Sequence, residues 1–157
     1  MSIQRAEFLA DARVKILRRT GIKIGVNSSF GSGVHISTGL LTVGDNVRIG
    51  AGSRIDNEAQ VTIHEWVRMG PEVLLETATH KLLPNGPYRR TSGDEVYKPI
   101  TIERGCMIYA RAIILPGVVI REGCVIGGGA VIDKSTQPNG LYVGNRPRSP
   151  TLVFPDN

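Results

Sequence analysis

The chain has 157 residues, including 19 glycines and two cysteines, with 5% aromatic residues and a formal net charge of +5. This composition is typical of one soluble domain and excludes a disulfide scaffold, a disordered chain and a membrane-spanning chain. The positive charge favours an anionic ligand. Without an apolar export signal we expect a cytoplasmic protein, with no membrane insertion and no nucleic-acid partner.

Residues 1–20 are predicted to form an amphipathic helix. Apolar residues recur at roughly helical spacing, with basic residues between them, at Phe8, Leu9, Ala12, Ile16 and Leu17. We expect this helix to cap one end of a second unit, residues 21–157. A basic helix lying on a membrane surface is the alternative interpretation.

An internal repeat of six residues dominates the rest of the chain. Isoleucine recurs at positions 102, 108, 114, 120, 126 and 132. A small or β-branched residue follows four positions later, at Cys106, Ala112, Val118, Cys124, Ala130 and Thr136. Upstream, the same pattern runs in shifted phases through Ile24–Ile36, Val43–Ile55 and Ile63–Leu75.

A period of six predicts a short strand and a turn, repeated around a triangular coil, with three hexapeptides in each coil. Five coils follow, at 24–41, 43–60, 63–80, 102–119 and 120–137. Stacking then places Ile102 on Ile120 and Ile108 on Ile126. Cys106 and Cys124 also stack, and we interpret them as small buried side chains rather than a disulfide or a metal pair.

The repeat stops after Leu75 and resumes at Ile102, and residues 81–99 between them are predicted to form a loop thrown out from the coil. His80 lies where the chain leaves the coil, and a histidine there can act as a general base. The other histidines, His35 and His64, do not share a stacking interval with it. We therefore predict no metal site, which also argues against a carbonic anhydrase built on the same coil.

The hexapeptide period resembles that of the hexapeptide-repeat acyltransferases, which implies a left-handed parallel β-helix. ETATHKL at 76–82 and SGDEVYKPITI at 92–102 are similar to the TATHPL and SGKEYGKP-like segments of the maltose, galactoside and nodulation-type O-acetyltransferases. The segments 114–134 and 142–148 resemble the closing repeats and tail of that family. The resemblance covers about 24–148.

The resemblance implies an O-acetyltransferase that uses acetyl-CoA, with His80 as catalytic base. By the same correspondence, the amides of Ala110 and Gly128 lie beside the donor. Basic side chains near its phosphates would be Lys134, Arg148 and, by proximity in sequence, Arg146. The acceptor would be a sugar or glycan, as in polysaccharide biosynthesis, and it would lie near Asp56, Asn57 and Glu95.

The chain departs from the family pattern at Tyr109, where the family often has glycine. Tyr109 is therefore expected to reshape the donor tunnel or the acceptor pocket. The resemblance also implies a homotrimer with active sites between subunits. Two alternatives stay open, namely a non-catalytic scaffold subunit and an N-acetyltransferase that acts on an amino sugar.

Overall fold

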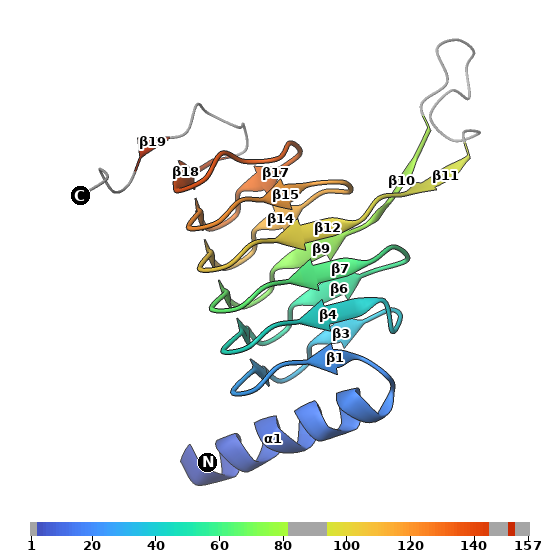
Figure 1. The fold of residues 1–157 in the computed structure, drawn as a ribbon, viewed down its shortest axis with the longest axis vertical. Coiled ribbons are helices and arrows are strands. Elements are labelled where there is room, and N and C mark those ends of the chain that lie inside the picture. The colour runs from blue at the N-terminus through green and yellow to red at the C-terminus, as the bar shows by residue number, and fades with distance from the viewer. Residues whose placement is uncertain (1–2, 82–93, 145–150, 153–157) are drawn as a thin grey trace.

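The computed structural model describes residues 3–81, 94–144 and 151–152, which form a parallel β-helix preceded by one helix (Figure 1). Three parallel sheets form the sides of the coil, and we name them A, B and C. Sheet A contains β1 (Lys23–Ile24), β4 (Leu41–Val43), β7 (Val61–Ile63), β12 (Ile100–Ile102) and β15 (Val119–Ile120). Sheet B contains β2 (Ser29–Phe30), β5 (Arg48–Ile49), β8 (Arg68–Met69), β13 (Met107–Ile108), β16 (Val125–Ile126), β18 (Gly140–Tyr142) and the antiparallel β19 (Thr151–Leu152). Sheet C contains β3 (His35–Ile36), β6 (Arg54–Asp56), β9 (Leu74–Glu76), β14 (Ile113–Ile114) and β17 (Val131–Ile132).

The register of the sheets confirms the stacking predicted from the period of six. Ile102 pairs with Ile120 in sheet A, and Ile108 pairs with Ile126 in sheet B. Five complete coils result, because each of the sheets A and C contains five strands. Strand β18 adds one side of a further coil on top of β16.

The core is a column of aliphatic side chains inside the coil. Each two-residue strand in the upper coils points its second residue inward, so that Ile108, Ile114, Ile120 and Ile126 are completely buried. Small buried residues fill the corners beside them, at Cys106, Ala112, Val118, Cys124, Ala130 and Thr136. Both cysteines are free thiols, as their interpretation as small core residues predicts.

The helix α1 (Ile3–Arg19) lies across the open end of the first coil (Figure 1). Val14 is buried and Leu17 packs partly against the core, whereas Ile16 is 60% exposed. The Arg13 guanidinium donates to the Phe30 carbonyl at 3.2 Å and ties the helix to β2. The predicted apolar face was therefore wrong at Ile16, because Val14 and Leu17, three residues apart, face the coil.

A hairpin of β10 (Ala78–His80) and β11 (Glu95–Tyr97) leaves the prism between β9 and β12 (Figure 1). Residues 81–99 were expected to form a loop without regular structure. Strand β11 lies within this range and pairs with β10, so the prediction was wrong for these residues. Residues 82–93 lie outside the described part of the chain. Over the described residues, no helix has the length and apolarity needed to cross a bilayer.

Candidate active site

The hairpin sets His80 directly opposite Glu95. The Lys81 amide donates to the Asp94 carbonyl at 2.9 Å, and the Lys98 amide donates to the Thr77 carbonyl at 2.9 Å. These bonds make Lys81 and Asp94, and likewise Thr77 and Lys98, hydrogen-bonded pairs. Because the two kinds of pair alternate along an antiparallel ladder, His80 and Glu95 form a non-hydrogen-bonded pair. The two side chains therefore share one face of the hairpin, with Cβ atoms typically about 4.5–5.5 Å apart at such a pair.

Tyr97 holds Glu95 from the same strand. The phenol of Tyr97 donates a short hydrogen bond to Oε2 of Glu95. This hydrogen bond, together with a smaller effect of burial and the nearby carboxylates, raises the pKa of Tyr97. The phenol therefore remains a donor throughout the neutral range, and Glu95 is held on the face of the hairpin that also bears His80.

An open concavity of about 460 Å³ lies between this hairpin face and the edge of sheet C. Its lining includes two of the three residues predicted to contact the acceptor, Asp56 and Glu95. The other residues that line it are Ser37, Arg54, Glu58, Glu76, Ala78 and Tyr97. Sequence reasoning missed these, although Asp56 pairs with Glu76 across the sheet and Ser37 donates to Asp56 at 3.2 Å. The signal was a polar residue at the end of each of the strands β3, β6 and β9, namely Ser37, Asp56 and Glu76, at intervals of 19 and 20 residues.

Asp56 is held rigidly at the floor of this concavity. Nη2 of Arg54 contacts both of its carboxylate oxygens, at 3.2 and 3.0 Å. Nε2 of His35 lies 3.8 Å from Oδ1 of Asp56. The Asp56 carboxylate is 18% exposed, so one edge of it still faces solvent and is open to a ligand.

Asn57, the third residue predicted to contact an acceptor, has a different position. Its side chain is completely buried. Oδ1 accepts a hydrogen bond from the Thr38 amide at 3.0 Å, and Nδ2 donates to the Thr38 carbonyl at 3.2 Å. The Thr38 hydroxyl in turn donates to the Asn57 carbonyl at 2.5 Å. Asn57 therefore ties two neighbouring coils together, and we do not include it among the residues proposed to contact the acceptor.

The corner between sheets B and C carries the two amides expected beside the donor. Ala110 and Gly128 stack there, since the Gly129 amide donates to the Ala110 carbonyl at 2.9 Å. Neither the Ala110 nor the Gly128 amide donates a hydrogen bond to another residue of the described chain. Both N–H groups are thus available to a ligand, as an oxyanion or an amide of a bound chain requires.

Tyr109 stands at this corner in a column that holds glycine in the other four complete coils and Val143 after β18. The equivalent residues after the strands of sheet B are Gly31, Gly50, Gly70 and Gly127. A methyl group built on Gly70 would come 2.7 Å from the Ala110 amide nitrogen, which shows how closely the coils approach here. The Tyr109 side chain is 53% exposed, so it stands beside the Ala110 amide as a wall that the glycines do not provide.

The hairpin and the two amides lie at opposite ends of the strands of sheet C, and we call these two ends the hairpin edge and the Ala110 corner. Ala110 precedes β14, whereas the hairpin follows β9, the neighbouring strand of that sheet. The width of one side of the coil, five to six residues at about 3.3 Å each, separates them by roughly 15–20 Å. Lys134 follows β17, so it is at the hairpin edge, and its side chain is exposed. Arg146 and Arg148 lie outside the described residues.

Neither cysteine is accessible to a substrate, because both are buried. Burial raises the pKa of the Cys106 thiol to about 12, despite backbone hydrogen bonds that oppose the shift. A thiol with that pKa is not a nucleophile at neutral pH. Within the described ranges, no group of three or more His, Cys, Asp or Glu side chains is placed to hold a metal ion.

Comparisons with known proteins agree with this geometry. Residues 99–134 match the family model described as bacterial transferase hexapeptide (six repeats). The repeat covers β12 to β17, the two coils that carry the Ala110 and Gly128 amides.

Curated proteins similar to this chain carry the names of acetyltransferases, several of them putative. The chain is 31% identical to the galactoside O-acetyltransferase of Lactococcus lactis subsp. lactis over 76% of its length and 50% of that relative. It spans about half the length of the curated relatives that it matches.

Solved structures show the same architecture. A hexapeptide-repeat acetyltransferase of Vibrio cholerae complexed with acetyl coenzyme A superposes with a TM-score of 0.78 and 26% identity, over 94% of this chain and 77% of that one. A maltose O-acetyltransferase of Clostridium difficile superposes with a TM-score of 0.76 and 29% identity, over 89% and 75%. The predicted fold and the predicted resemblance to hexapeptide-repeat acetyltransferases are confirmed.

Proposed function

We propose that this chain transfers an acetyl group from acetyl-CoA to a hydroxyl of a sugar or glycan acceptor. The observation that carries the proposal is the hairpin register, which sets His80 opposite Glu95 beside the concavity floored by Asp56. A histidine and an acidic residue in this relation suit general-base catalysis. The similarity to an acetyltransferase complexed with acetyl coenzyme A and to a galactoside O-acetyltransferase supports the same reaction.

In the proposed mechanism, the neutral imidazole of His80 accepts the proton of the acceptor hydroxyl as its oxygen attacks the acetyl carbonyl. Glu95, held by Tyr97, orients the imidazole and stabilises its charged form. The Ala110 amide donates to the carbonyl oxygen as negative charge develops on it. Acetyl-CoA supplies an acyl group activated as a thioester, so the new C–O bond forms as the C–S bond breaks. His80 then returns its proton to the leaving thiolate.

We further propose that each site uses two chains of a homotrimer. Within one chain, the roughly 15–20 Å between the hairpin edge and the Ala110 corner is too far for a hydroxyl deprotonated by His80 to reach a thioester held at Ala110. A rotational arrangement of identical chains can bring the hairpin of one chain to the amide corner of the next. Lys134 lies at the hairpin edge, so it would approach the donor phosphates from the same chain as His80. Arg146 and Arg148 are proposed as further phosphate contacts.

The first test is acceptor-dependent release of thiol from acetyl-CoA across a panel of sugars and glycans. His80→Ala should lower turnover by about 10²–10⁴-fold with little change in thermal stability. His64→Ala is the matched control, because His64 is also exposed but lies at another corner of the coil. Near-normal activity in His80→Ala would remove His80 from the mechanism, and absence of acetyl-CoA binding would favour a scaffold.

A mixed-oligomer experiment tests the shared site. Gly128→Trp should block the donor corner, while His80→Ala removes the base from the hairpin. If each site takes the two groups from different chains, random mixing of the two inactive variants restores about a quarter of the sites in a trimer. Mixtures that remain inactive would contradict a shared site.

Treatment of the product with mild base distinguishes O-transfer from N-transfer, since mild base hydrolyses an ester and leaves an amide intact.

A further inference from the structure

Trp66 occupies a backbone position that suits asparagine or glycine. At the corner between sheets A and B, one residue of each coil has a positive φ, and φ of Trp66 is 62°. The equivalent residues of the other coils are Asn27, Asn46, Gly105, Gly123 and Asn139. Backbone hydrogen bonds confirm that these residues stack, because each amide from Asn46 onward donates to a corner carbonyl of the preceding coil. A bulky side chain in this conformation is a genuine outlier.

The fold gains little packing from the residue that carries this strain. The Trp66 side chain is 61% exposed, the highest exposure among the large apolar side chains of the described chain. Because strained residues persist mainly where function requires them, an exposed tryptophan at a left-handed corner points to recognition rather than to stability.

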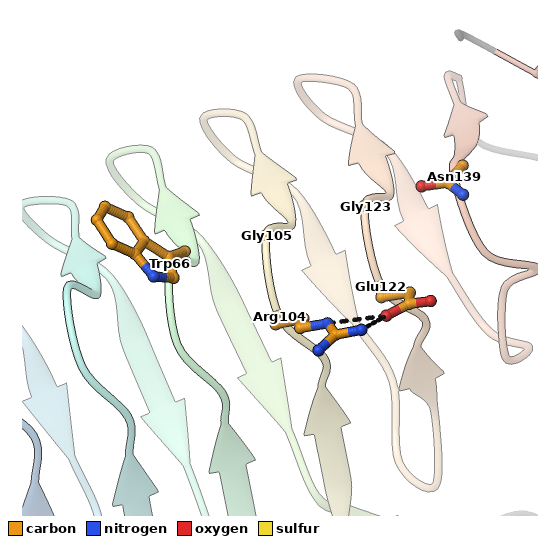
Figure 2. Close-up of a pocket in the computed structure, with 6 residues that line it drawn as sticks. All are labelled: Trp66, Arg104, Gly105, Glu122, Gly123 and Asn139. Atoms are coloured by element: carbon orange, nitrogen blue, oxygen red, sulfur yellow. Dashed lines mark hydrogen bonds and ion pairs between the residues drawn. The ribbon is translucent and has the colours of Figure 1, made fainter. Parts of the chain in front are cut away.

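A cavity of about 380 Å³ lies along this corner, with Trp66 at one end and Asn139 at the other (Figure 2). Gly105 and Gly123 form the wall between them, and no atom lies within 4 Å of a methyl group built on Gly105. A methyl group on Gly123 would come 2.0 Å from Oδ1 of Asn139. The absence of side chains at Gly105 and Gly123 therefore creates the cavity and leaves room for the side-chain amide of Asn139 beside Gly123.

The polar groups of this cavity form a neutral set. Nε and Nη2 of Arg104 contact Oε2 of Glu122 at 2.9 and 2.8 Å (Figure 2). This ion pair cancels the formal charge, but it leaves further guanidinium N–H groups and the second carboxylate oxygen available. Donors and acceptors thus alternate beside an aromatic ring, without a net charge that would select an ion.

We propose that this corner is a second binding site, which takes a neutral pyranose ring of a glycan. One face of a pyranose is rich in C–H groups and can pack on an indole, while its hydroxyls both donate and accept hydrogen bonds. Arg104, Glu122 and Asn139 supply partners of both kinds. Trp66, Gly105 and Gly123 follow strands of sheet A, whereas the hairpin precedes β12 of the same sheet. The site therefore lies at the other end of these strands and would hold a glycan without competing with the proposed transfer reaction.

Trp66 is the single tryptophan of the chain, so its fluorescence reports on this site alone. We would titrate the full chain, without acetyl-CoA, with neutral hexasaccharides of glucose, galactose and N-acetylglucosamine. A saturable change in emission with at least one of them is expected. Calorimetry should show about tenfold weaker binding by Trp66→Asn, which places the residue used elsewhere in this column at the corner. The titration contains no acetyl-CoA, so its result does not depend on catalysis.

Two further measurements keep the proposal falsifiable. Trp66→Asn should melt no lower than the wild type, and Glu122→Gln, which leaves the indole in place, should also weaken binding. Absence of a saturable change with all three hexasaccharides would overturn the proposal, as would equal affinities of wild type and Trp66→Asn. A change in the sedimentation of the assembly caused by Trp66→Asn would also overturn it, by placing the indole between copies of the chain.

Discussion

Replacing Asn57 by alanine separates a structural role for this residue from a role in acceptor binding. The change removes the bonds to the Thr38 amide at 3.0 Å and to the Thr38 carbonyl at 3.2 Å. Each such bond contributes about 1 kcal/mol, and more when its partner is left unpaired away from water. Since Asn57 is completely buried, we expect the free energy of unfolding to fall by about 2–3 kcal/mol.

Thermal unfolding at fixed protein concentration measures this loss, and the expected decrease in Tm is roughly 4–12 °C for a chain of this size. The matched control is Glu58→Ala, because Glu58 is the exposed neighbour of Asn57 and its removal should change stability by less than about 0.5 kcal/mol. Below its Tm, Asn57→Ala should keep kcat/KM for the acceptor near that of the wild type. An unchanged Tm together with a tenfold loss of kcat/KM would refute the structural role.

Three further predictions concern the core and the donor corner. Ile108→Ala should lower the free energy of unfolding by about 2–5 kcal/mol in urea titrations, because the residue is completely buried between neighbouring coils. A thiol-specific reagent at pH 8 should label Cys106 only after unfolding. Folding raises the pKa of the Cys106 thiol from 9.0 to about 12. The contribution of this thiol to the free energy of unfolding should therefore be complete below about pH 9 and decline as the pH rises toward 12. Cys106→Ala should remove this decline from the pH dependence of stability. Gly70→Ala should weaken acetyl-CoA binding in calorimetry by displacing the Ala110 amide, 2.7 Å from the added methyl group; unchanged affinity would show that this amide does not contact the donor.

The coil could be predicted because its repeat is local and regular. Once a side of the coil takes six residues, simple counting places Ile102 on Ile120 and Ile108 on Ile126, as the structure has them. The helix could be predicted from its spacing, but its buried face could not. How α1 lies over the first coil decides that Val14 is buried and Ile16 is 60% exposed.

The candidate site was predicted in part, through residues next to recognisable segments. Asp56 and Glu95 do line one concavity, although 39 positions separate them in the sequence. Asn57 was expected beside them because it corresponds to an aspartate of the family that the sequence resembles, yet successive residues at a strand end face opposite sides, and its side chain is buried inside the coil. Trp66 was overlooked, although HEW at 64–66 stands where the preceding coil has GDN at 44–46.

The sequence by itself determined the repeat, the stacking of the core and the place where the chain leaves the coil, because each of these depends on the order and spacing of residues along one strand path. The tertiary structure alone decided which polar side chains meet. The pairing of His80 with Glu95 depends on the hairpin register, and the separation of His80 from the Ala110 amide depends on the width of sheet C. Contacts outside the repeat follow from how strands pair in space, and the six-residue period does not encode them.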